Sequence, residues 1–560
     1  MFHKITRHMV TMQGGRQVHY RRAGSGSPVI LLHQSPNSSQ EYIDLINELS
    51  EEYTVFAPDT PGNGLSDTLS VEAPSMTDYA ANVAELMDNL GIKACPIYGF
   101  HTGAVCTLEF AWRYPEKVTV AVVNGYVNMP EALVEDIKEN YFAPLEFNWS
   151  GSHMTWTWAR FREQTIFFPW YRTDSASRMS YNVPSASQIH TAMIEFLRSG
   201  PEYRKPYRAA FTQDAVQSVQ EMSANCIIMS PKTDVLYSGL DRMPTPSNSV
   251  TVYRPDTPDQ AIDILKDQFR LNKSLQAAPP IADTKPITGQ LWGQYLEVGG
   301  GSLYCRRNTD AAGTPVLFIH SSSGSSLSMD RYMAPFIGKR PVISIDLPGY
   351  GESDNPMGAG FSIEKQASFI AEALHSLDYD TVDTFGNWGG GTVAIQLAYQ
   401  YPDLVSNVAI PNIIYTDLKG AELKKMLDVY APDITFDEFG AHWIYVWNML
   451  RDKELFNPWY DRTAKNIVND GEPDIEASIL HQKTLDFFKS FPLYKIAYQA
   501  YFSYPVLERL ADLNSRVMIG NPAAESSKKI ISDQLDKCVV TEMSREHGTL
   551  AKELLDFFNA

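Results

Sequence analysis

The amino-acid sequence predicts an α/β protein built from two similar domains, each with a mostly parallel sheet flanked by helices. Short apolar, β-branched runs alternate with segments of helix length in both halves of the chain. This alternation is typical of parallel strands that are joined by helices. A strand-like run, a Gly-x-x-x-Gly turn and a helix-like run also occur together once in each half, with the turns at 99–103 and 386–390.

The same elements follow one another in the same order in both halves. The register between the halves is nearly constant, so few insertions separate them. The shared elements, first half and then second half, are a Gly-Gly pair and a strand with two basic residues (14–22, 299–307), a core strand followed by histidine (29–33, 316–320), a Pro-Gly-x-Gly loop (59–67, 346–354), the Gly-x-x-x-Gly turn (99–103, 386–390) and a helix that ends in Tyr-Pro (102–115, 389–402).

The repeat also sets the expected domain boundaries. We expect one domain at 1–275 and the other at 290–560, joined by a linker at 276–289 that is rich in proline and poor in large apolar residues. Each half carries an insertion before its last strands, at about 128–222 and 415–512. Aligned aromatic, histidine and arginine residues make these insertions the most similar part of the repeat.

Taken together, these motifs resemble those of the α/β-hydrolase fold. The two glycine turns have the spacing of the G-x-S-x-G nucleophile elbow, a sharp strand-to-helix turn that exposes its central residue. The resemblance implies a sheet with the elbow after about the fifth strand and a helical cap formed by each insertion. Both elbows depart from the family pattern, because His101 and Trp388 stand in place of the serine. An ordinary serine hydrolase is therefore not expected.

The remaining members of a catalytic triad are divided between the halves. The resemblance places the acid at Asp234 in the first half, where the base position holds Pro258. In the second half the base position holds His547, and the acid position holds alanine with Glu525 beside it. The first half therefore keeps an acid and has a histidine at the elbow, whereas the second half has a histidine but no nucleophile.

His101 is the main catalytic candidate. Histidine can take up and return a proton near neutral pH, and it tolerates the positive φ of an elbow better than bulky residues do. The family resemblance implies an oxyanion hole from the backbone N–H groups of Thr102 and of Gln34 or Ser35. A structural histidine in a decayed site is the alternative. A metal site of His33, His101, His153 and His190 has no supporting spacing, and we expect no metal and no cofactor.

The insertions supply the expected binding residues. His153, Arg162 and His190 are candidates in the first half, with Trp158 and Tyr207 covering an apolar part of the substrate. Packing within the cap, or an Arg162 pair with Glu163 or Glu195, is the alternative. The lower-ranked candidates of the second half are Trp388, His442, Arg451, His481, Glu525 and His547. We expect the Trp388 ring to fill the former substrate space; a platform for ligand stacking is the other interpretation.

Composition excludes several classes of partner. The formal net charge is −19, with 47 Lys and Arg against 66 Asp and Glu, which argues against non-specific nucleic-acid or anionic-membrane binding. No apolar run reaches the length of a membrane span, no signal sequence is evident, and five scattered cysteines fit a reduced, cytoplasmic protein.

These observations predict an enzyme without a serine nucleophile, using His101 for hydrolase, lyase or isomerase chemistry on a small apolar or aromatic carbonyl compound with an oxygen-rich group. The second half would be a degenerate copy that completes an internal pseudo-dimer. Two alternatives stay open: a binding or scaffold protein with two inactive sites, and catalysis in the second half by His547 with a group such as Ser321–Ser323.

Overall fold

The computed structural model describes residues 4–358, 360–468, 472–520 and 538–560. The chain folds into two compact units. The first unit consists mainly of residues before Pro286, and the second consists mainly of residues from Pro286 onward. This boundary lies inside the expected linker. The earlier part of the linker is bound to the first unit, since Pro279 accepts a hydrogen bond from Arg22, and Thr284 donates one to the carbonyl of Met9.

The first unit contains an eight-stranded sheet in the order β1-β2-β4-β3-β5-β6-β7-β8. Only β2 runs against its neighbours, and the other pairings are parallel. The strands are β1 (Thr6–Thr11), β2 (Gln17–Ala23), β3 (Ser27–Leu32), β4 (Tyr53–Pro58), β5 (Cys95–Phe100), β6 (Val118–Asn124), β7 (Cys226–Met229) and β8 (Val250–Tyr253).

Helices cover both faces of this sheet, because its central strands are apolar on both sides. One face packs against α2 and α3, and the other packs against α1 and α9. These four helices are α1 (Ile43–Leu49), α2 (Met76–Asn89), α3 (Thr102–Arg113) and α9 (Pro258–Leu271).

The second unit repeats this arrangement. Its sheet order is β16-β15-β14-β13-β11-β12-β10-β9, which is the first order read from the other edge. Its strands are β9 (Trp292–Val298), β10 (Gly301–Asn308), β11 (Val316–Ile319), β12 (Val342–Ile345), β13 (Val382–Gly386), β14 (Val405–Ile410), β15 (Arg516–Ile519) and β16 (Cys538–Val540). The helices on its faces are α10 (Asp330–Met333), α11 (Ile363–His375), α12 (Gly389–Gln400) and α19 (His547–Asn559).

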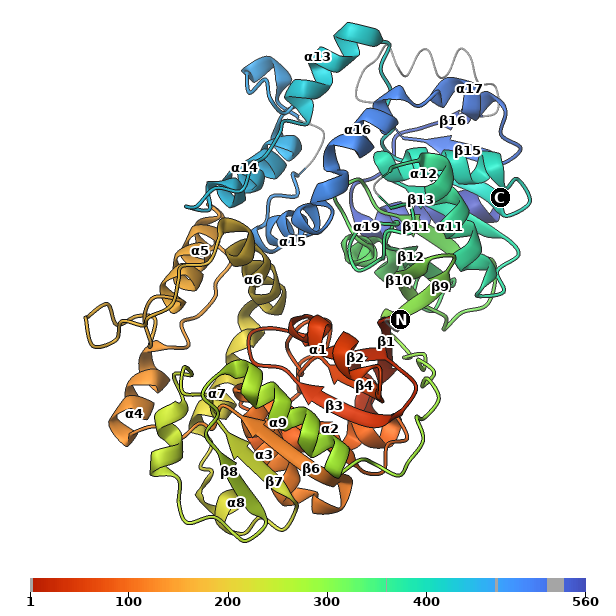
Figure 1. Cartoon of the computed structure of the whole chain (residues 1–560). Helices are drawn as coiled ribbons and strands as arrows, with labels where there is room; N and C mark the ends of the chain where they lie inside the picture. Colours follow the sequence, from red (N-terminus) through yellow and green to blue (C-terminus); the bar gives the residue numbers. More distant parts are fainter. Residues whose placement is uncertain (1–3, 359, 469–471, 521–537) are drawn as a thin grey trace. The chain divides into compact units, whose positions relative to one another are not determined.

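Each insertion is helical and enters between the sixth and seventh strands of its sheet. Figure 1 shows α5 and α6 extending away from the first sheet. The first insertion contains α4 (Glu131–Asn140), α5 (Ser152–Gln164), α6 (Ala186–Ser199), α7 (Arg204–Thr212) and α8 (Val216–Gln220). The second contains α13 (Gly420–Tyr430), α14 (Ala441–Leu455), α15 (Ala477–Lys489), α16 (Tyr494–Ser503) and α17 (Val506–Ala511).

The expected fold class is therefore correct, and so is the position of the two glycine turns. Each turn follows the fifth strand of its sheet, β5 or β13. All five cysteines are free thiols. Within the described ranges, none of the helices combines the length and apolar character that crossing a membrane requires.

Candidate active site

His101 lies in a strained turn between β5 and α3. Its φ and ψ are 49° and −111°, a region in which non-glycine residues are strained by about 1–3 kcal/mol. The flanking glycines allow the chain to turn this tightly. A Cβ atom at Gly99 would lie 2.1 Å from the carbonyl oxygen of Gly103, and one at Gly103 would lie 2.0 Å from the carbonyl oxygen of Leu32. The Gly-x-x-x-Gly pattern thus has a direct steric cause.

Asp234 binds the His101 ring. His101 Nε2 lies 2.8 Å from Asp234 Oδ2, and the backbone N–H of Leu236 donates to Asp234 Oδ1 over 2.8 Å. Burial disfavours the charged carboxylate, but the hydrogen bond and charge of His101 outweigh it, so the pKa of Asp234 lies below its usual value. An ionised carboxylate only accepts hydrogen bonds. Nε2 therefore carries a proton, and in the neutral imidazole the lone pair lies on Nδ1.

The ends of β5 and β6 hold the ring in place. The Phe100 ring stacks on the His101 ring with centroids 4.1 Å apart, and the side chain of His101 stays 25% exposed. The His101 N–H donates to the carbonyl of Asn124. The next residue, Gly125, has a φ of 90°, and a Cβ atom there would lie 2.4 Å from His101 Cδ2. Gly125 thus makes the room that the imidazole occupies.

We expect Gly125→Ala to push the His101 ring away from Asp234. Two costs add here, the positive φ and the steric conflict with the ring, so the protein should lose about 2–3 kcal/mol of stability. The control is Gly14→Ala, because Gly14 has a similar φ of 78° and no atom lies within 4 Å of the place that the new methyl group would take. Calorimetric melting of both variants separates the two costs. Equal losses in the two variants would mean that Gly125 leaves no special space for His101.

Two of the expected oxyanion-hole donors are already engaged. The Gln34 N–H donates to Glu41 Oε1 over 3.0 Å, and the Ser35 N–H donates to Thr102 Oγ1 over 2.5 Å. The expectation that either group is free is therefore wrong, because neighbouring side chains supply its acceptor. The Thr102 N–H remains, in the first turn of α3, where a helix has no acceptor of its own to offer.

The histidine after the first core strand is structural in both units. His33 Nδ1 lies 2.8 Å from the Gln34 carbonyl, and His33 Nε2 accepts from the Thr60 N–H over 2.8 Å. His320 makes the same two contacts in the second unit. With both ring nitrogens engaged, His33 is not available as a metal ligand. The described residues contain no group of three or more His, Cys, Asp or Glu side chains placed to hold a metal ion.

Three of the candidates in the first insertion differ from expectation. The Arg162 side chain is 44% exposed and lies 3.3 Å from Glu163, which is the ion pair given above as the alternative. Trp158 and Tyr207 are 3% and 6% exposed. Tyr207 packs among the rings of the insertion itself, namely Tyr141, Phe142, Tyr203 and Phe211. The rings around Tyr207 therefore build a core for the insertion, because rings gain more from packing with one another than from covering a wet surface.

His153 and His190 are buried in the insertion. Each is 5% exposed, and burial lowers the pKa of His153 to about 4. His153 is therefore neutral near pH 7. The His101 ring itself contacts Phe100 and Asp234. Neither Phe100 nor the supporting Gly125 was identified from the sequence. A glycine directly after a core strand is the signal that could have drawn attention to the latter.

The elbow of the second unit has the same backbone but a different side-chain environment. Trp388 has φ and ψ of 51° and −118°, and the residue is 42% exposed. The expectation that the Trp388 ring fills the former substrate space stays a prediction. Residues 411–414 after β14 are Pro, Asn, Ile and Ile. No glycine stands there to make room, and the larger indole remains partly in solvent.

Among the described residues, the other candidates of the second unit form no triad. The His547 ring packs edge-to-face on Tyr332 with centroids 4.7 Å apart, and burial, with Arg331 nearby, lowers the pKa of His547. No hydrogen bond joins His547 to residues 321–323 in the part of the chain that the structure describes. His442 and His481 are buried, and Arg451 is partly exposed. Glu525 lies outside the described residues.

Each insertion is tied to the loop after the first core strand through a carboxylate. Ser38 Oγ donates to Glu195 in the first unit, and Ser325 Oγ donates to Asp486 in the second over 2.8 Å. Asp486 also accepts a hydrogen bond from Gln482 over 2.9 Å.

Burial, only partly offset by Lys489, raises the pKa of Asp486 to about 7. The protonated form of Asp486 therefore stabilises the second unit.

We expect Asp486→Asn to remove a pH dependence of stability. Because the folded-state pKa is raised, the stabilisation by this group is complete below about pH 4 and is lost as the pH rises through about 7. A shift of this size corresponds to roughly 4 kcal/mol. Calorimetric melting should show the variant more stable than the parent at pH 8 and by a clearly smaller margin at pH 5, because only part of the stabilisation is lost at pH 5. Asp512→Asn, at an exposed position, is the control. An equal difference at both pH values would refute the buried-acid account.

Comparison with known proteins agrees with the strand order and the two turns. The α/β hydrolase fold family matches residues 27–164 and 314–437, one segment in each half. An uncharacterized hydrolase of Saccharomyces cerevisiae is 30% identical over 147 residues, which are 26% of this chain and 49% of the relative. A soluble epoxide hydrolase of Corynebacterium is 37% identical over 109 residues, 20% of this chain and 37% of the relative.

The chain spans less than half the length of these two curated relatives. A cis-3-alkyl-4-alkyloxetan-2-one decarboxylase of Shewanella oneidensis is 28% identical over 130 residues, 22% of this chain and 41% of that relative. Among solved structures, an epoxide hydrolase from an endophytic Streptomyces gives a TM-score of 0.39 at 16% identity, covering 49% of this chain and 97% of that one. The family match in both halves, together with the shared strand order, identifies this chain as a tandem pair of α/β-hydrolase-fold domains.

Proposed function

We propose that the first unit is an enzyme in which His101 acts as a general base on a small carbonyl compound with an apolar or aromatic body. The observation that carries this proposal is the contact of 2.8 Å between His101 Nε2 and Asp234 Oδ2, at an elbow where the ring stays 25% exposed. The base of the ordinary triad is absent, since Pro258 begins α9 at that position. The imidazole of His101 at the elbow contacts Asp234 directly and replaces that base.

The dyad supplies a proton acceptor. His101 Nδ1 takes a proton from water or from a carbon acid, Asp234 stabilises the imidazolium that forms, and the proton returns to the product. General base catalysis of this kind contributes about 10²–10⁴-fold in rate. Because the Gln34 and Ser35 N–H groups are engaged, a hole of two or more backbone amides is not preformed. Of the expected backbone donors, this leaves the Thr102 N–H for the oxyanion that forms when activated water adds to a carbonyl group.

The first insertion is proposed to act as the cap of this site. Tyr181, within the insertion, donates a hydrogen bond from its hydroxyl to the carbonyl of Thr233, directly before Asp234. Ser38 and Glu195 provide a second link between the insertion and the core. These contacts bring the insertion to the loops around the dyad. The hydrolase and decarboxylase names of the relatives are compatible with hydrolysis or with cleavage next to a carbonyl group.

A binding protein without catalysis is the second candidate, and the engaged Gln34 and Ser35 N–H groups favour it. A substrate screen separates the two. The purified chain is assayed against panels of esters, lactones and epoxides, in parallel with a Trp388→Ala/His547→Ala double variant. We expect turnover of esters or lactones, retained in the double variant, whereas turnover of epoxides alone would contradict a carbonyl substrate. Loss of turnover in that variant would move the site to the second unit, and saturable binding without turnover would favour the binding protein.

A further inference from the structure

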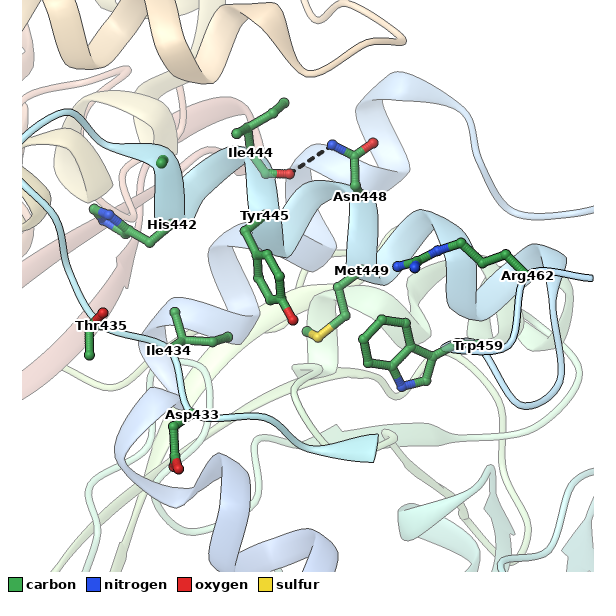
Figure 2. Close-up of a pocket in the computed structure, with 11 residues that line it drawn as sticks. Asp433, Ile434, Thr435, His442, Ile444, Tyr445, Asn448, Met449, Trp459 and Arg462 are labelled. Atoms are coloured by element: carbon green, nitrogen blue, oxygen red, sulfur yellow. Dashed lines mark hydrogen bonds between the residues drawn. The ribbon is translucent and has the colours of Figure 1, made fainter. Parts of the chain in front are cut away.

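A cavity of about 480 Å³ lies in the second insertion, apart from the elbow residues. Figure 2 shows it between α14 and the extended segment around Asp433. All of its lining residues come from the second insertion. Cavities of about 300–1,000 Å³ suit small organic ligands. The size of this one therefore fits a compound of one or two rings.

The wall of the cavity is apolar and aromatic. Met449 and Tyr445 face it from α14, and Trp459 closes one side (Figure 2). The Trp459 ring is held in place, because its N–H donates to the Tyr430 carbonyl over 3.0 Å and the residue is 5% exposed. Tyr445 is 46% exposed. One wall is thus preformed, while another ring is free to pack on a ligand.

Arg462 brings a cation to the same wall. Its guanidinium lies 5.5 Å from the centroid of the Trp459 ring, and its Nε donates to Asp452. The side chain is 52% exposed, and Figure 2 shows the guanidinium of Arg462 beside Met449 and Trp459. Among the described residues, the hydrogen bond of Arg462 to Asp452 uses Nε, and the planar end of a guanidinium matches a carboxylate or sulfonate group. Asp433, the acidic lining residue, is itself paired with Lys495 at 2.8 Å.

The first insertion has a different side chain at the position that corresponds to this cavity. Trp170 Nε1 donates to the Tyr141 carbonyl as Trp459 Nε1 donates to that of Tyr430, and this register aligns Arg160 with Met449. Arg160 is 2% exposed, and its guanidinium lies 5.4 Å from the centroid of the Trp170 ring. In the first unit a buried cation therefore packs beside the tryptophan. In the second unit the shorter side chain of Met449 takes the position of Arg160. The cation there is Arg462, which lies at the edge of the cavity.

We propose that this cavity binds a small organic anion with a flat apolar body, which packs on Tyr445, Met449 and Trp459 while its carboxylate or sulfonate binds Arg462. The chemistry of recognition is a ring system joined to one anionic group. The site is independent of the dyad in the first unit, so the proposal holds whether or not His101 is catalytic.

Fluorescence titration of the whole chain tests this with 8-anilinonaphthalene-1-sulfonate and its neutral analogue N-phenyl-1-naphthylamine. Asn448→Trp fills the cavity from an exposed position of α14, and Val429→Trp, at an exposed position of α13, is the matched control. We expect Asn448→Trp to weaken sulfonate binding at least about tenfold and Val429→Trp to leave it unchanged. Arg462→Gln should weaken sulfonate binding about tenfold, a difference of about 1.4 kcal/mol, and change binding of the neutral analogue less than about twofold.

Melting temperatures of the three variants check that each is folded. Unchanged sulfonate affinity in both Asn448→Trp and Arg462→Gln would show that the probe binds elsewhere and would overturn the proposal. Equal weakening of both probes by Arg462→Gln would overturn the anionic class of ligand. Weakening by Val429→Trp as strong as that by Asn448→Trp would remove the assignment to this cavity.

Discussion

His101→Ala is expected to lower kcat/KM by about 10³-fold or more for the substrate that the screen identifies, with little change in melting temperature. The variant removes the only proton acceptor that the dyad offers, and general base catalysis contributes about 10²–10⁴-fold. The fold loses little, because the side chain is 25% exposed and its main contacts are the Phe100 ring and Asp234. Steady-state kinetics and calorimetry on the same preparations measure both effects.

His547→Ala is the matched control in the second unit. Its ring packs on Tyr332 and makes no hydrogen bond to residues 321–323 in the described part of the chain, so we expect less than a twofold change in kcat/KM. The reverse ranking, with activity lost in His547→Ala and kept in His101→Ala, would place catalysis in the second unit.

Asp234→Asn is expected to lower kcat/KM by about 10²-fold or more while preserving the shape of the site. The Leu236 N–H donates to Oδ1, so an asparagine at this position keeps its oxygen there and turns its NH₂ group toward His101. An NH₂ group donates, and Nε2 must then accept. The imidazole proton moves to Nδ1, and the free lone pair that the base needs is lost.

Asp241→Asn controls for the removal of a carboxylate in the same segment. Asp241 is 2.8 Å from Arg254 and its side chain is 64% exposed, so its loss should leave kcat/KM nearly unchanged. If Asp234→Asn retained more than half of the parent activity, the orientation of His101 by Asp234 would have no catalytic role.

The fold could be predicted from the sequence because the repeat shows each element twice. Alternating apolar and helix-length segments give parallel strands, and the glycines at 99 and 103 predict the elbow because only they fit the close backbone approach. The pairing of His101 with Asp234 could also be predicted from the order of the elements. Both residues follow the ends of parallel strands, which meet at one edge of the sheet.

The environment of the site could not be predicted in the same way. Whether the Ser35 N–H is free depends on the rotamer of Thr102, which is 67 positions away in sequence. Whether Arg162 faces a ligand or solvent depends on the rotation of α5, and aromatic spacing fits a pocket wall and a packed core equally well. Trp388 was assigned to a filled pocket from its size, although the residues after β14 leave its ring partly exposed.

The tautomer of His101 tests the central claim most directly. Nitrogen-15 NMR of histidine-labelled protein, with the His101 signals assigned by their loss in His101→Gln, reports which ring nitrogen carries the proton. We predict that the neutral ring carries its proton on Nε2 and has an unprotonated Nδ1, and that Asp234→Asn moves the proton to Nδ1. A parent ring that carries its proton on Nδ1, or one that Asp234→Asn leaves unchanged, would contradict a dyad with Nδ1 as the base.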